Sequence, residues 1–420
     1  MKFAVITFLS CLAFWSHLSW AETSPAQKNT QFLSWFWERP LATQGEVRTL
    51  PHQEQVCHPL VPGTCGLCHT PQYTDWQRSR HAKAMGPGTI GQFFHMHEAK
   101  RQDCMNCHAP LYEQGEALEQ HLYGYREAQD QCDSSTANSE THVDKPLPEQ
   151  GVICAACHIR AGRWYGPPRR KDILPLETSE PLPHDGWTSD EAFQDSRFCS
   201  ACHQFPPDGF RLNGKLIENT YEEWLASPQA QEGESCQSCH MPNRRHLFRG
   251  IHDPETVQSG VEVGSHSFSL SQGEVTVSVF LTNTGVGHRL PTYVTPEIHL
   301  EAYQEDDKGM RIPDTEQITW VARRVSLDLT TEHFDTRLSP GQTATLSYKK
   351  AISPRARSLV TRVYVEPDAF YRRIYEALLE MRPQEPGSDL IHTALADSKR
   401  SGFSIYEQRY LLVKQTGSDK

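Results

Sequence analysis

The chain has 420 residues, of which 37% are hydrophobic and 22% charged, and its formal net charge is −11. This length allows two or three domains of ordinary size. The acidic balance excludes a nucleic acid as partner, because a protein that binds a polyphosphate presents a basic surface to it.

The N-terminus, residues 1–21, has the pattern of a secretory signal peptide. Lys2 precedes an apolar run, and the small residues Ser19 and Ala21 mark a cleavage site. A membrane anchor is the alternative, but the apolar run is shorter than the roughly 20 residues that cross a bilayer. The sequence therefore predicts export to the periplasm, with an extracellular or outer-membrane-associated location as the further destinations.

Residues 22–60 form an N-terminal segment that is polar but carries Trp35 and Trp37. Two interpretations are open: the aromatic residues pack across the next domain, or they dock a membrane-associated partner complex. Cys57 and Cys132 are the two cysteines that belong neither to the signal peptide nor to a repeated motif. In an oxidising compartment two spare thiols pair most simply with each other, so we expect a disulfide; two separate buried thiols are the alternative.

Five Cys-x-x-Cys-His motifs lie between residues 65 and 240. On one helical turn, residues i, i+3 and i+4 share a face, so two thiols can bond the vinyl groups of a porphyrin while the histidine reaches the iron. Zinc sites and thioredoxin-like motifs also pair cysteines, but neither requires the histidine that follows. The motifs therefore predict five covalently attached haem c groups.

The residues of the five predicted haem sites are read directly from the motifs. The thioether cysteines are Cys65, Cys68, Cys104, Cys107, Cys154, Cys157, Cys199, Cys202, Cys236 and Cys239. The proximal iron ligands are His69, His108, His158, His203 and His240. This stretch is too short for five separate domains, so we predict one pentahaem domain over residues 61–255, mostly helical or irregular, whose core is largely made of stacked macrocycles. Without haem the polypeptide is expected to be largely unfolded.

A second axial ligand decides the chemistry of each haem, because two strong ligands make an electron carrier and an open position permits catalysis. The distal candidates are His81, His97, His246, His252 and His288. His97 is preferred to His95, since residues two apart cannot face one haem from a regular helix. Ligation by Met85 or Met96 is the alternative, and histidine on both sides is the better default.

Short alternating runs follow from residue 256 to residue 366, and they predict a β-sandwich of about seven strands. The sandwich contains no cysteine, so it carries no covalent haem. It is expected either to shield the haems from water or to contact a partner and donate His288. Residues 367–420 are expected to form a C-terminal helical segment, with helical periodicity near 370–381, a second helix over 388–403 and a final strand or helix. The fold class predicted is α+β multidomain.

Several stretches resemble a known family. Trp76, Ser79, His81 and Ala82 match the W-x-x-S-x-H-A signature of multihaem cytochromes related to cytochrome c554, which in turn resemble the group that includes hydroxylamine oxidoreductase. FCSACHQF, TYEEW, CQSCHMP, RHLFRGIHDP and GVGHRLPT are similar to a run in multihaem cytochromes c. The resemblance covers residues 60 to 300 and implies the same distal candidates, His81, His246, His252 and His288. The chain has five motifs where cytochrome c554 has four, so the correspondence between individual haems stays open.

These observations predict an exported electron carrier that receives electrons from one redox protein and passes them to another. Beyond the haems it requires no catalytic residue. One alternative is an oxidoreductase with an open haem that acts on hydroxylamine or on a nitrogen or sulfur oxyanion; the chain lacks the Cys-x-x-Cys-Lys motif of pentahaem nitrite reductase. The other alternative is a structural subunit of a cytochrome complex or filament.

Overall fold

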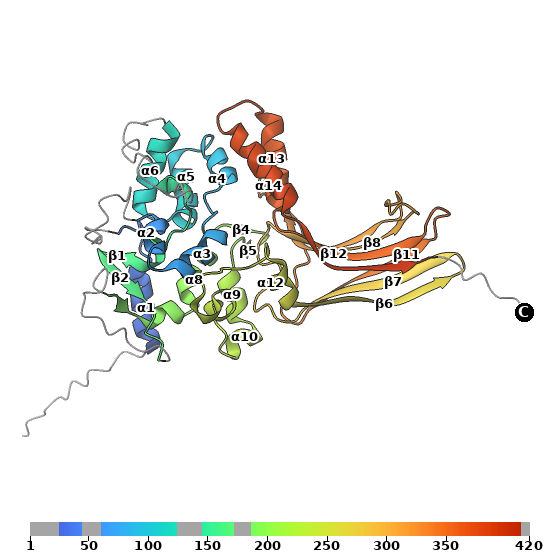
Figure 1. Cartoon of the computed structure of the whole chain (residues 1–420), viewed down its shortest axis with the longest axis horizontal. Helices are drawn as coiled ribbons and strands as arrows, with labels where there is room; N and C mark the ends of the chain where they lie inside the picture. The colour runs from blue at the N-terminus through green and yellow to red at the C-terminus, as the bar shows by residue number, and fades with distance from the viewer. Residues whose placement is uncertain (1–24, 44–59, 124–144, 172–185, 413–420) are drawn as a thin grey trace, which may run out of the picture.

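The computed structural model describes residues 25–43, 60–123, 145–171 and 186–412. The predicted signal peptide and the expected Cys57–Cys132 disulfide lie outside these ranges. Short helices gather at one end of the molecule, and long strands extend from them at the other (Figure 1). The predicted α+β class, with a β-rich region that follows a helical one, is confirmed.

The helical part is made of short elements joined by loops. Its α-helices are α1 (Pro25–Phe36), α2 (Pro62–Gly66), α3 (Thr70–Arg78), α4 (Pro87–Phe93), α5 (Glu98–His108), α6 (Tyr112–Tyr123), α7 (Cys154–His158), α8 (Arg197–His203), α9 (Thr220–Leu225), α10 (Pro228–Gln231), α11 (Cys236–His240) and α12 (Pro254–Ser259). Among the described residues, three 3₁₀ turns accompany them, η3 (Leu147–Glu149), η5 (Glu191–Gln194) and η6 (Pro242–Arg244). Proline occupies the first turn of several of these helices, where its missing N–H costs no hydrogen bond.

Two small sheets complete the helical part within the ranges that the structure describes. They consist of β1 (Ile159–Arg160), β2 (Arg163–Gly166) and β3 (Thr188–Ser189), and of the hairpin β4 (Arg211–Leu212) and β5 (Lys215–Leu216). Helix α1 packs across this part: Phe36 is fully buried, and Trp37 meets Phe198 edge-on with ring centres 5.0 Å apart. Trp35 also meets Tyr165 edge-on, with ring centres 5.7 Å apart, but it keeps 43% of its surface exposed. Both tryptophans therefore join this packing, and Trp35 remains the more exposed of the two.

The strands form a sandwich of two antiparallel sheets. They are β6 (Val261–Ser271), β7 (Glu274–Asn283), β8 (Glu297–Glu305), β9 (Gln317–Val325), β10 (Glu332–Asp335), β11 (Thr343–Ala351), β12 (Ser358–Glu366) and β13 (Phe403–Leu411). One sheet has the order β10-β9-β8-β12-β13 and the other the order β11-β7-β6. Seven of these strands lie within residues 256–366, and the eighth, β13, joins the edge beside β12.

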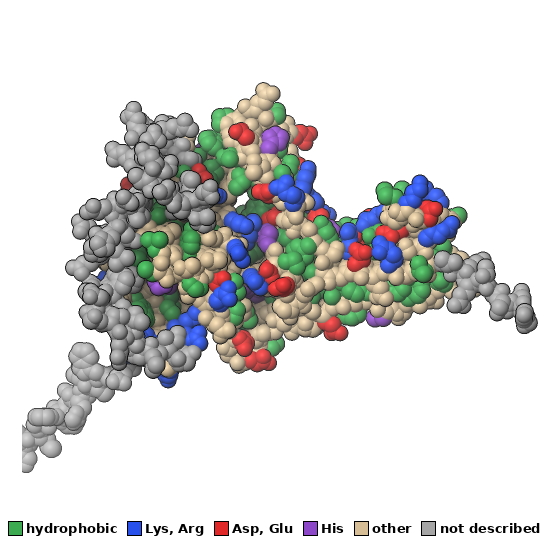
Figure 2. Space-filling view, in the orientation of Figure 1, with side chains coloured by type: hydrophobic (Ala, Val, Ile, Leu, Met, Phe, Trp, Pro, Cys, Tyr) green, Lys and Arg blue, Asp and Glu red, His purple; other side chains and the backbone are tan. Residues whose placement is uncertain are grey.

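Alternation along each strand explains why the two sheets pack face to face. In β7 every second residue is buried, including Val277 and Val279, and its neighbours point outward. Leu300 of β8 and Val363 of β12 are paired across the other sheet and fully buried. These side chains belong to one hydrophobic cluster that fills the space between the sheets. Basic side chains gather near the far tips of the strands on the face shown in Figure 2.

The C-terminal segment is not wholly helical. Helices α13 (Ala369–Met381) and α14 (Ser388–Arg400) lie close to where the residue patterns place them, but the chain then returns as β13. Ile405 points from β13 into the sandwich cluster, and this burial favours a strand there. Helix α14 reaches back to α4, where a side chain on Gly91 would collide with Ile391. The C-terminal helices therefore bind the helical part to the sandwich.

Candidate haem-binding site

The motif histidines stand at the ends of short helices. Helices α5, α7, α8 and α11 each end at a motif histidine, and the backbone N–H of His69 donates to the carbonyl of Cys65 at 2.8 Å, as in a helical turn. Each motif is thus wound so that both thiols and the imidazole come from one turn. This is the arrangement that the spacing predicted for covalent haem attachment.

Backbone carbonyls orient three of these rings. The Nδ1–carbonyl distances are 2.8 Å for His108 to Ala84, 2.8 Å for His158 to Tyr165 and 2.5 Å for His240 to Arg249. Because a carbonyl only accepts, Nδ1 must carry the proton, and the lone pair of Nε2 remains for a metal. His203 differs, since its Nδ1 lies 2.6 Å from the hydroxyl of Tyr293.

Three motif histidines each face a second imidazole from a distant part of the chain. The ring centres are 6.2 Å apart for His158 and His246, 6.1 Å for His203 and His81, and 6.4 Å for His240 and His288. A metal–imidazole bond measures about 2.0 Å, and a ring nitrogen lies about 1.1 Å from the centre of a ring whose bonds are about 1.3 Å. Two imidazoles on opposite sides of one iron would therefore have centres about 6.2 Å apart. The three pairs have the separation of axial ligands.

The second histidine of each pair is also in a form that can coordinate a metal. Nδ1 of His246 lies 3.1 Å from the carbonyl of Arg244, and Nδ1 of His288 lies 2.9 Å from that of Arg289, so both rings keep Nε2 available. Burial lowers the pKa of His81 to about 3. Burial likewise lowers the pKa of His158, His203 and His288 to about 4. These imidazoles are neutral at physiological pH, which is the form that coordinates a metal.

The W-x-x-S-x-H-A residues hold His81 in place. The indole N–H of Trp76 donates to the carbonyl of Val152 at 2.7 Å, and the backbone N–H of Val152 donates to the carbonyl of His81 at 2.9 Å. The hydroxyl of Ser79 accepts from the backbone N–H of Ala82 at 3.3 Å. The signature therefore fastens the turn that carries His81 to the segment before the third motif.

Asp75, the residue before Trp76 in α3, holds His246 in place. Asp75 accepts two hydrogen bonds from the Arg245 guanidinium, both of 2.6 Å, and one from the backbone N–H of His246 at 3.2 Å. The Arg245 guanidinium keeps the pKa of this carboxyl below its usual value. Asp75 and Trp76 are consecutive in α3, so one short helix positions the second histidine of two different pairs.

Contacts between thiols show which motifs are neighbours. The thiols of Cys65 and Cys154, of Cys107 and Cys202, and of Cys199 and Cys236 lie close enough to shift one another's pKa. Cys157 of the third motif also lies within electrostatic range of Cys202 in the fourth. In the loaded protein these sulfurs would be thioethers. The first motif thus adjoins the third, the third adjoins the fourth, and the fourth adjoins both the second and the fifth.

Two buried donors add a further sign that a cofactor fits. The indole N–H of Trp37 and Nη1 of Arg39 are buried without a hydrogen-bond acceptor among the described residues. Such donors are costly to leave unpaired, and a porphyrin carries carboxylates that would accept from them. Together with the imidazole pairs and the thiols on helical turns, they show that the residues present suit haem c.

Two of the distal candidates do not join a pair in the described part of the chain. His97 is exposed at the start of α5. Nε2 of His252 lies 3.0 Å from Asp368, so a carboxylate occupies the nitrogen that a metal would need. The alternatives differ as well: His95 lies beside Glu385, and Met85 is packed in a cluster between α4 and α5. The ligands opposite His69 and His108 stay a prediction.

Sequence reasoning missed the residues that support the ligands. Tyr293 stands five residues after His288, directly after the GVGHRLPT stretch, and it reaches the histidine of the fourth motif rather than the fifth. Glu223 lies in the TYEEW stretch and holds the loop of His288. Glu223 lies within a stretch that resembles the family and Tyr293 directly follows one, but nothing in the spacing of either residue indicates its partner.

Comparisons with known proteins give a match to a family model and a match to a solved structure. Residues 64–253, somewhat less than half of the chain, match the family model described as outer membrane cytochrome MtrC/MtrF-like, domains II/IV. The crystal structure of a penta-heme cytochrome c552 from Thermochromatium tepidum has a TM-score of 0.56 at 17% sequence identity, and the likeness covers 85% of this chain and 100% of that chain. At this identity the likeness shows a shared fold.

A second solved structure, the putative ApaA protein from Bordetella pertussis, covers 25% of this chain and 74% of its own at 14% identity, but its TM-score of 0.14 is too low to bear on the fold. No curated protein sequence matches the chain. Within the described ranges, none of the helices has the length and apolar character needed to cross a membrane.

The motifs, the fold and the family match support one class, a multihaem c-type cytochrome. Haem c is its cofactor and electron transfer is the activity of that class.

Proposed function

We propose that the protein is an exported pentahaem cytochrome c that carries electrons between two redox proteins. The observation that carries this proposal is the set of three imidazole pairs, because an iron with two histidines has no position left for a substrate. Bound haem would supply the reversible one-electron chemistry. The chain supplies the ligands, the order of the sites and their shielding from water.

The order of the motifs suggests where the partners bind. Thiol contacts connect the first motif to the third and the fifth to the fourth. Cys68 of the first motif and Cys239 of the fifth are exposed, whereas the other motif cysteines are partly buried. We therefore place the contact of one partner at the first motif and that of the other at the fifth, so that electrons traverse the chain of motifs between them.

Three finer parts of the proposal rest on the sequence. The signal-peptide pattern of residues 1–21 supports export, and a destination in the periplasm or at the outer membrane accords with a family described as outer membrane cytochromes. The count of five haems rests on five motifs, and the likeness to a penta-heme cytochrome accords with it. The closer relation to cytochrome c554 rests on the signature around His81, whose residues hold that ligand.

Substitution of the second histidine in each pair tests the proposal. We expect H81A, H246A and H288A each to convert one haem from low-spin to high-spin, seen by electron paramagnetic resonance of the ferric holoprotein. H266A is the matched control, because His266 is exposed on β6 and has no motif partner; its spectrum should equal that of the parent. Unchanged low-spin signals in all three variants would exclude these pairs.

The same spectra separate the alternative functions. A high-spin haem in the resting parent, together with turnover of hydroxylamine or an oxyanion, would indicate an oxidoreductase. A high-spin signal that disappears when copies of the chain assemble would indicate a structural subunit whose histidines complete a neighbour's haems.

A further inference from the structure

One loop of the sandwich contacts two different haem motifs. It runs from residue 284 to residue 296 and connects β7 to β8. His288 faces His240 of the fifth motif, with ring planes inclined by only 12°. Five residues later, the Tyr293 hydroxyl lies 2.6 Å from Nδ1 of His203 in the fourth motif. The segment therefore reaches a ligand position of one site and the proximal histidine of the next.

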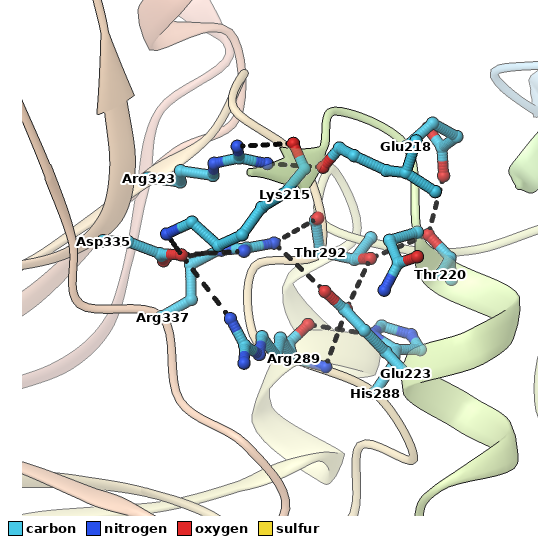
Figure 3. A network of polar contacts seen from close by, with 12 residues as sticks. Lys215, Glu218, Thr220, Glu223, His288, Arg289, Thr292, Arg323, Asp335 and Arg337 are labelled. Atoms are coloured by element: carbon cyan, nitrogen blue, oxygen red, sulfur yellow. Dashed lines mark hydrogen bonds and ion pairs between the residues drawn. The ribbon is translucent and has the colours of Figure 1, made fainter. Parts of the chain in front are cut away.

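Glu223 holds this loop from the side of the helical part. Its Oε2 accepts from the backbone N–H of Arg289 at 3.2 Å and from the hydroxyl of Thr292 at 3.1 Å. Figure 3 shows this carboxylate lying between the loop and helix α9, which carries it. Both bonds lie between His288 and Tyr293 in the chain, since Arg289 directly follows His288 and Thr292 directly precedes Tyr293. One side chain thus fixes both contacts.

Arg337 holds the loop from the side of the sandwich. Its Nη1 donates to the carbonyl of Thr292 at 2.8 Å and to Oε1 of Glu223 at 3.2 Å. Its other nitrogens donate to the two oxygens of Asp335 at 2.8 and 3.0 Å, and Asp335 also accepts from Lys215 at 2.6 Å (Figure 3). The loop is therefore held between the carboxylate of Glu223 in the helical part and the guanidinium of Arg337 in the sandwich. We call this ion pair the clamp.

The clamp is buried, so a change in either of its residues should disturb the groups around it. Only 3% of the Arg337 side chain and 8% of the Glu223 side chain are exposed. A buried ion pair contributes little to stability compared with a hydrophobic pair of the same shape, but the loss of one partner leaves an uncompensated charge. Such pairs can specify one arrangement of the groups around them. Here the groups around the pair are the loop residues that meet the two motifs.

We propose that Glu223 and Arg337 are positioning residues through which the sandwich sets the axial ligation of the fifth haem and the hydrogen bond to the proximal histidine of the fourth. This inference rests on the proposed function, because it requires His240 and His288 to share one iron. The sandwich is then more than a cover over the haems, since it completes one site and tunes the next.

The test uses the holoprotein and the variants E223Q and R337M. We expect each to release His288 and to produce a high-spin ferric signal from one haem, with the remaining haems unchanged. Arg362→Gln is the matched control, because it removes another sandwich ion pair, 2.7 Å from Glu301, that lies away from the loop. The control should lower the melting temperature without altering the spin state.

A less disruptive variant is needed if E223Q and R337M do not fold. Thr292→Val preserves shape and removes the hydroxyl that donates to Glu223, so a smaller high-spin fraction is expected. Tyr293→Phe should leave every haem low-spin but raise the midpoint potential of one, because the hydrogen bond to Nδ1 makes the proximal imidazole more basic and favours ferric iron.

The outcomes distinguish this inference from the proposed function. If E223Q, R337M and T292V lower the melting temperature but keep the parent spectrum, the clamp is merely structural and the inference is wrong. If H288A also keeps the parent spectrum, the histidine pair itself is wrong and the proposed ligation fails with it. A high-spin signal in H288A alone overturns only the clamp.

Discussion

The sandwich and the haem-binding part differ in how they fill their interiors. In the sandwich, twenty buried hydrophobic residues form one continuous cluster. In the described residues of the helical part, the clusters hold ten, six and four buried residues and are separate from one another. Separate clusters of that size are a small core for a region of this length, so we expect haems to supply the rest of its interior.

The comparison shows two ways in which a sequence can encode a fold. The sandwich is encoded by alternation, which repeats every two residues and specifies both faces of a strand. The helical part is encoded by covalent anchor points, between which short helices and loops need only reach the next ligand.

The largest effect should follow from withholding haem. When the chain is produced without cytochrome maturation, we expect residues 60–253 to lose structure while residues 261–411 keep their strands, because only the latter have a core of their own side chains. Hydrogen exchange followed by mass spectrometry measures both regions in one sample. Equal protection in the two regions of the haem-free protein would contradict the contrast.

A core substitution in the sandwich should be the next largest effect. Leu300→Ala removes a fully buried side chain from the centre of the cluster, and such changes cost about 3 kcal/mol of unfolding free energy. Denaturant titration followed by far-ultraviolet circular dichroism measures the loss. Leu67→Ala, at a leucine that is 68% exposed in the first motif, is the control and should cost almost nothing.

Alkaline pH should weaken the sandwich through His299. Burial lowers the pKa of this imidazole, but Glu297 and Glu301 outweigh burial and raise the pKa to about 9. Because the folded pKa lies above the unfolded value of about 6.5, the stabilisation is complete below about pH 6.5 and is lost as the pH rises towards about 9. Unfolding free energy should fall by on the order of 2 kcal/mol over that range. His299→Gln should remove this part of the pH dependence, and an unchanged slope would rule out His299 as its source.

The smallest effect should come from a surface ion pair. Lys349 and Glu274 lie 3.2 Å apart on neighbouring strands, and their side chains are 65% and 44% exposed. Because solvent screens such a pair, K349A should change the unfolding free energy by less than about 0.5 kcal/mol. A loss as large as that of L300A would mean that the outer face of the sandwich is part of its core.

What the sequence predicts depends on how local the signal is. The Cys-x-x-Cys-His turns and the alternating strands are local patterns, and both regions were placed from them. The partner of His158 is not local, because His246 comes from beyond two further motifs and is aligned by Asp75 in α3. Nor is the pairing of β13 with β12, since two helices intervene. The clamp of Glu223 and Arg337 joins residues over a hundred positions apart, and no spacing rule relates them.

Electron paramagnetic resonance of the ferric holoprotein, integrated against its haem content, tests the central claim most directly. We expect five haems per chain that survive acid-acetone extraction, of which at least three are low-spin with the signature of two imidazole ligands. A protein with five haems of which fewer than three are low-spin would contradict the histidine pairs, and a well-folded colourless protein would contradict the account as a whole.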